Sequence, residues 1–89
     1  MISKNNPKIE YSDINIGGTI IPKDSFIDIN TGVKPYTTTF HVFPANTLWS
    51  FVSNFWTGSD GNIMVTIVNP MDFDITESSG AYLRVFWLG

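Results

Sequence analysis

The chain has 89 residues, of which 43% are hydrophobic and 15% aromatic, so we expect one packed domain and not a disordered protein. Its formal charge is -3, and its few Lys and Arg residues are scattered, which excludes the basic stripe that binds a nucleic-acid backbone. Without cysteine, the fold has neither disulfides nor thiolate metal sites to stabilise it.

The first ten residues, MISKNNPKIE, predict an N-terminal arm. They are polar and contain Pro7, which is typical of a segment outside the core, and the domain is expected at residues 11–89. The start lacks the apolar stretch of a secretory signal, and no segment approaches the roughly 20 apolar residues of a membrane span. We therefore expect a soluble protein that is made inside the cell and not inserted into a membrane.

The rest of the chain has the composition and turn spacing of an all-β fold. Turn-forming residues recur at short intervals, for example at Gly17-Gly18, Pro44-Ala45-Asn46 and Asn69-Pro70, and the segments between them are rich in β-branched and aromatic residues. Strands are predicted at residues 11–16, 19–21, 26–29, 36–43, 47–56, 62–68, 73–76 and 81–88. About eight short strands indicate a small antiparallel β-sandwich or jelly roll.

The longest predicted strand, residues 47–56, has two alternating faces. The aromatic-rich face is expected to point into the core, and it contains Trp49, Phe51, Ser53 and Phe55. Trp56 belongs to the other set and is expected to point outward.

Titratable residues give no convincing catalytic pattern. His41 is the only histidine and lies in a regular strand pattern opposite Phe40 and Val42, which favours a structural role. A Ser-His-Asp triad would also need a nucleophile elbow, and the only Gly-Ser pair, Gly58-Ser59, is not in that motif. We predict that the protein is not an enzyme and has no catalytic residue.

Two carboxylates, Asp72 and Asp74, flank Phe73. In a one-sided strand, Phe73 and Ile75 would face the core while the carboxylates face water. The alternative roles are a hydrolase pair or, with Glu77, a calcium site, but small sandwiches rarely have a cleft and the spacing is not that of an EF-hand loop. We predict no cofactor and no metal site.

The terminal segment AYLRVFWLG is apolar on both sides. One side carries Leu83, Val85 and Trp87, and the other carries Tyr82, Arg84, Phe86 and Leu88. A small domain has one core, so one face is predicted to be core and the other an interface between copies of the chain, with the faces reversed if the register slips by one residue. The predicted interface residues are Tyr82, Phe86 and Leu88, together with Trp56.

The three tryptophans support an alternative function. Trp49, Trp56 and Trp87 are suited to stack on sugar rings if they are exposed. This alternative is a carbohydrate-binding or host-receptor-binding module that uses exposed aromatic residues.

The short all-β chain, the polar arm and the terminal strand YLRVFWLG resemble small bacteriophage virion proteins such as decoration, collar and tail-tip modules. The resemblance covers the whole chain in texture and carries no functional residue across. It implies an oligomeric β-sandwich attached by its arm to a larger virion assembly, with host-surface glycan binding in some members. The expected function is a non-enzymatic structural or adhesive one in the virion, after synthesis in the host cytoplasm.

Overall fold

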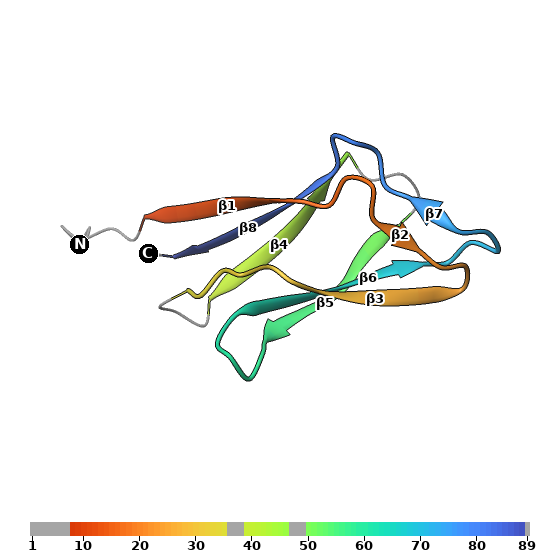
Figure 1. Cartoon of the computed structure of the whole chain (residues 1–89). Coiled ribbons are helices and arrows are strands. Elements are labelled where there is room, and N and C mark those ends of the chain that lie inside the picture. Colours follow the sequence, from red (N-terminus) through yellow and green to blue (C-terminus); the bar gives the residue numbers. More distant parts are fainter. Residues whose placement is uncertain (1–7, 36–38, 47–49, 89) are drawn as a thin grey trace.

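The computed structural model describes residues 8–35, 39–46 and 50–88, and this part of the chain contains eight strands (Figure 1). They are β1 (Ile9–Asn15), β2 (Ile20–Ile21), β3 (Ser25–Asn30), β4 (Phe40–Ala45), β5 (Phe51–Thr57), β6 (Ile63–Asn69), β7 (Ile75–Thr76) and β8 (Tyr82–Leu88). The predicted all-β fold is confirmed. Across the described ranges, no helix is long and apolar enough to cross a membrane.

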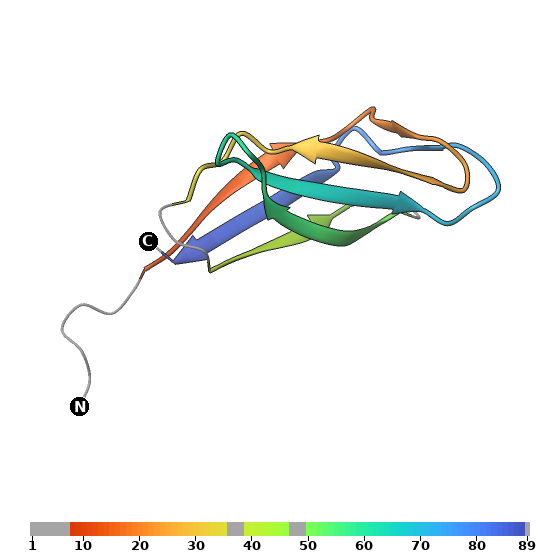
Figure 2. The same cartoon turned by 90° about the horizontal axis from the view of Figure 1, so that it is seen from below.

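Two antiparallel sheets form the layers of a sandwich (Figure 1; Figure 2). One sheet has the strand order β1-β8-β4 and the other has the order β3-β6-β5, while β2 and β7 pair as a short ribbon. The central strands, β8 and β6, therefore have hydrogen-bonded neighbours on both sides. The sandwich is confirmed, and the more specific jelly-roll topology stays a prediction.

The core lies between the two central strands. Val65 and Ile67 of β6 and Leu83 and Val85 of β8 are at most 1% exposed. In both strands the buried residues alternate with more exposed ones, as expected when one face of a sheet covers the core. Trp87 of β8 packs against the same core. The inward face of the terminal strand is thus the one that contains Leu83, Val85 and Trp87.

The predicted inward orientation of Phe51 and Ser53 is wrong, because both side chains are exposed. The pairing of β5 with β6 shifts between Val52 and Asn54, which leaves Ser53 as an extra residue in β5. Such a bulge changes the phase of the alternation along a strand. Phe55, beyond the bulge, packs against the core as predicted, whereas Phe51, before it, faces outward.

The predicted inward orientation of Phe73 is also wrong, since this residue is 46% exposed. The strand was expected to begin at Phe73, but β7 contains only Ile75 and Thr76. Phe73 therefore lies in the preceding bend, where strand alternation does not fix its direction. Ile75 is buried, and Asp72 and Asp74 are exposed, as predicted.

Several strand ends differ from the predictions. β1 starts at Ile9, so the last two residues of the predicted arm pair with β8. Pro44 and Ala45, predicted as a turn, lie in β4, where proline is tolerated because β4 is an edge strand. Residues 1–7, 36–38 and 47–49 lie outside the described residues, and with them the predicted inward position of Trp49.

Candidate functional site

Within the described ranges, no group of three or more His, Cys, Asp or Glu residues is placed to hold a metal ion. His41 lies among aromatic rings, with its ring centre 5.1 Å from that of Phe55 and 5.6 Å from that of Phe86. The other candidate surfaces are the outer faces of the two sheets.

The outer face of the β1-β8-β4 sheet gathers aromatic residues from all three strands. The strand register places Tyr11, Phe86 and His41 in one row across the sheet. Paired residues of antiparallel strands project from the same side, so residues in this row and in alternate rows share the outer face. We call this surface the aromatic face; it comprises Ile9, Tyr11, Asp13, His41, Phe43, Tyr82, Arg84, Phe86 and Leu88.

Large apolar side chains of the aromatic face are open to solvent. The exposed fractions are 71% for Ile9, 61% for Tyr11, 56% for Phe43 and 36% for Leu88. These residues come from strands that neighbour one another in the sheet, so they form one surface and not isolated exposed groups. Next to the Ile9 end, a hollow of about 220 Å³ is also lined by apolar and aromatic side chains.

A single ion pair lies within the aromatic face. Arg84 donates two hydrogen bonds to the Asp13 carboxylate, from Nε to Oδ1 at 2.8 Å and from a terminal nitrogen to Oδ2 at 2.9 Å. Its guanidinium carbon lies 4.4 Å from the ring centre of Tyr11 and 5.8 Å from that of Tyr82. The pairing lowers the pKa of Asp13 and raises the pKa of Arg84 beyond its usual range. Both groups therefore stay charged at neutral pH, and their charges cancel.

Replacing Arg84 by Gln should raise the pKa of Asp13 toward its ordinary value of 3.8, because the hydrogen bonds from Arg84 are the main cause of its lowering. A carboxylate whose pKa is lowered by folding contributes stability above its ordinary pKa, and that contribution is lost as the pH falls through the folded-state pKa. A carboxyl NMR titration of both proteins checks the change.

Asp60 provides the control for this titration. Its pKa is also lowered, chiefly by a hydrogen bond from the backbone N–H of Asn62, in a loop that does not involve Arg84. Its titration midpoint should be the same in both proteins. An unchanged Asp13 midpoint in the Arg84→Gln protein would show that the ion pair does not control this carboxylate.

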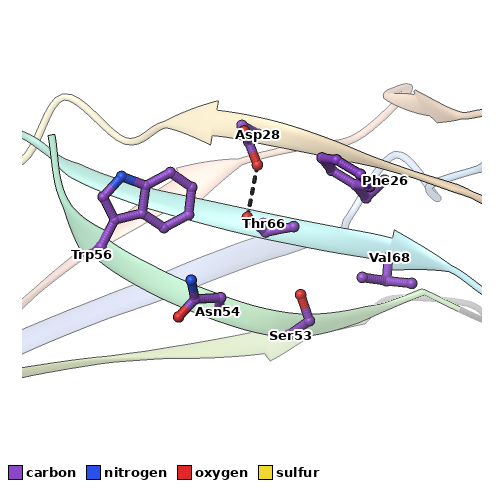
Figure 3. A pocket seen from close by; sticks show the side chains of 7 residues that line it. All are labelled: Phe26, Asp28, Ser53, Asn54, Trp56, Thr66 and Val68. Atoms are coloured by element: carbon purple, nitrogen blue, oxygen red, sulfur yellow. Dashed lines mark hydrogen bonds between the residues drawn. The ribbon is translucent and has the colours of Figure 1, made fainter.

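The outer face of the other sheet carries a groove with a mixed lining. It has a volume of about 410 Å³ and draws on all three strands, β3, β6 and β5. We call it the Trp56 groove; it is lined by Phe26, Asp28, Ser53, Asn54, Trp56, Thr66 and Val68 (Figure 3). Two aromatic rings and a set of hydrogen-bonding side chains thus share one shallow, open hollow.

The predicted interface residues divide between the two sheets. Tyr82, Phe86 and Leu88 lie together on the aromatic face, whereas Trp56 lies on the outer face of the β3-β6-β5 sheet. Of the residues predicted to stack on sugars, Trp56 lines the groove and Trp87 packs against the core. The third, Trp49, lies outside the described residues.

Most residues of either surface were not predicted from the sequence. Tyr11 and Phe43 join the aromatic face, and Phe26 and Asp28 join the groove. A usable signal exists in β3, where Phe26 and Asp28 alternate with the partly buried Ile27. Alternation shows which residues share a face, but it does not show which strands lie next to each other.

Comparison with known proteins gives no relative for this sandwich. No protein-family model matches the chain, and no curated protein or solved structure matches it. Its function is therefore inferred from the two surfaces and from the resemblance described for the sequence.

Proposed function

We propose that the protein is a non-enzymatic structural or adhesive module that assembles as a homo-oligomer through its aromatic face, as part of a bacteriophage particle. The observation that carries the proposal is the exposure of Ile9, Tyr11, Phe43 and Leu88 on one sheet face. Soluble monomers rarely leave a continuous apolar patch of this kind uncovered. A second copy of the same chain is the most common partner for such a surface.

The charges of the aromatic face favour a copy of the chain over an unrelated apolar partner. Asp13 and Arg84 lie side by side, so a two-fold axis that passes between them, perpendicular to the line that joins them, would bring each Arg84 toward the Asp13 of the other subunit. Covering the pair with a purely apolar surface would remove water from both charges without adding any compensating group. A symmetric pairing instead supplies opposite charges from both sides.

The particle assignment rests on the resemblance of the whole chain to small phage virion proteins. In this proposal the polar segment before β1, which contains Pro7, attaches the oligomer to a larger neighbour. Mass spectrometry of purified particles of the virus that encodes the protein tests the location, independently of the oligomeric state.

The Phe86→Ser change should give a folded protein of lower oligomeric order. Phe86 lies on β8 between Tyr11 and His41 in the strand register, so its loss removes an aromatic ring from the middle strand of the face. Light scattering over a range of protein concentrations measures the mass, and circular dichroism verifies the fold.

Phe73→Ser is the matched control, because Phe73 is an exposed phenylalanine outside the aromatic face. This variant should keep the mass of the unaltered protein. A protein that is monomeric at high micromolar concentration, with Phe86→Ser no less stable, would refute the oligomer and leave the face to a foreign partner.

A further inference from the structure

We propose that the Trp56 groove binds a neutral carbohydrate, an activity that goes beyond assembly through the aromatic face. The groove lies on the opposite sheet, so the two surfaces share no lining residue. Its volume of about 410 Å³ is in the range of small-ligand sites. The occupant follows from the combination of rings, hydrogen-bonding groups and charge.

The aromatic part of the groove suits the apolar face of a sugar ring. Trp56 reaches from β5 across the sheet toward β3, and Phe26 lies further along β3 (Figure 3). Phe26 is 60% exposed, and Trp56 is partly exposed. Tryptophan offers a large flat surface together with one N–H donor, which allows stacking and hydrogen bonding on the same ligand.

The polar part of the groove suits sugar hydroxyls, which both donate and accept hydrogen bonds. Asp28 on β3 accepts a hydrogen bond of 2.7 Å from the Thr66 hydroxyl, and this bond orients the carboxylate at the side of the groove (Figure 3). Each carboxylate oxygen can accept more than one hydrogen bond. Asn54, on the β5 side, is exposed and offers both a carbonyl acceptor and an amide donor.

The bulge in β5 contributes directly to this polar lining. Ser53 and Asn54 are adjacent in sequence, and regular alternation would send one of them into the core. Because the register shifts between Val52 and Asn54, both residues are exposed and both line the groove. Bulges are common beside functional sites, where they redirect a side chain.

The charge of the lining disfavours anionic occupants. The seven lining residues include one carboxylate and no Lys or Arg, which disfavours phosphate groups and anionic sugars. A neutral glycan fits both the aromatic and the polar part of the lining.

An array of neutral oligosaccharides, with and without N-acetyl groups, and of sialylated oligosaccharides tests the proposal with the full-length protein. We expect binding to neutral glycans only, followed by calorimetry with the strongest of them. Trp56→Ala and Asp28→Asn should each weaken binding by about 10-fold or more, as is typical when a central contact of a site is removed. Asp28→Asn changes an exposed side chain to one of the same shape, so it tests the site even if Trp56→Ala does not fold.

Two controls separate this result from assembly. Phe73→Ala alters an exposed ring outside the groove and should bind like the unaltered protein. Phe86→Ser lowers the oligomeric order if the proposed function is right, but it should not change the affinity per site in calorimetry. The proposal is overturned if no glycan on the array binds, if only sialylated glycans bind, or if folded Trp56→Ala and Asp28→Asn proteins keep full affinity.

Discussion

Replacing Leu83 by Ala should lower the free energy of unfolding by about 2–5 kcal/mol, the usual cost of a cavity in a packed core. The same change at Leu88 should cost less than about 1 kcal/mol in the monomer, as expected for a partly exposed position. Leu83 is 0% exposed, whereas Leu88 is 36% exposed on the other side of the same strand. The pair therefore compares one substitution on the two apolar faces of β8.

Urea unfolding followed by circular dichroism measures both values. The protein should be dilute enough to be monomeric, because assembly through the aromatic face would add stability that depends on Leu88 and on concentration. A larger loss at Leu88 than at Leu83 would mean that the strand faces are reversed, the outcome expected from a slip of one residue in the register. Equal losses would contradict the division into a core face and an outer face.

The strands were predictable because their signals are local. Turn residues such as Gly17-Gly18 and Asn69-Pro70 separate segments rich in β-branched residues, and each predicted strand that lies within the described ranges appears in the structure. The direction of Phe51 was not predictable in this way. It depends on the bulge at Ser53, which is defined by how β5 pairs with β6 and not by the sequence of β5 alone.

The candidate surfaces were predictable only in part, for a related reason. Alternation in the terminal strand placed Tyr82, Phe86 and Leu88 together, and the structure agrees. The ion pair joins Arg84 to Asp13 across most of the chain, through the pairing of β8 with β1. Such long-range neighbours follow from sheet topology, which neither composition nor periodicity determines.

The two proposals fit together through the sandwich itself. The aromatic face and the Trp56 groove lie on the outer sides of different sheets. Assembly through the aromatic face would leave the grooves of all subunits accessible. Several grooves could then bind the same glycan-rich surface at once, which would raise the overall affinity above that of a single groove. A variant of either surface should therefore reduce adhesion, although only the groove variants should change the affinity of a single site.

Replacing Asn69 by Ala should lower the free energy of unfolding by about 2–3 kcal/mol, because one buried and three partly buried backbone groups would lose their hydrogen-bond partner together. Asn69 is 1% exposed at the end of β6. Its Nδ2 group donates to the carbonyl oxygens of Ile21 and Phe73, both at 2.9 Å, and of Pro22 at 3.2 Å. Its Oδ1 accepts a hydrogen bond of 2.8 Å from the backbone N–H of Met71.

This one side chain thus connects β6 to the end of β2 and to the bend before β7. Urea unfolding gives the overall loss, and hydrogen exchange gives a local readout, since the Met71 amide should exchange faster without its acceptor. Asn54→Ala removes the same side chain from an exposed position and should change stability by no more than about 0.5 kcal/mol. The opposite outcome is a stability loss for Asn69→Ala as small as that for Asn54→Ala, with the Met71 amide still protected from exchange. Water would then replace the lost hydrogen bonds, and the Asn69 side chain would not be what holds β2 and the bend before β7 to the core.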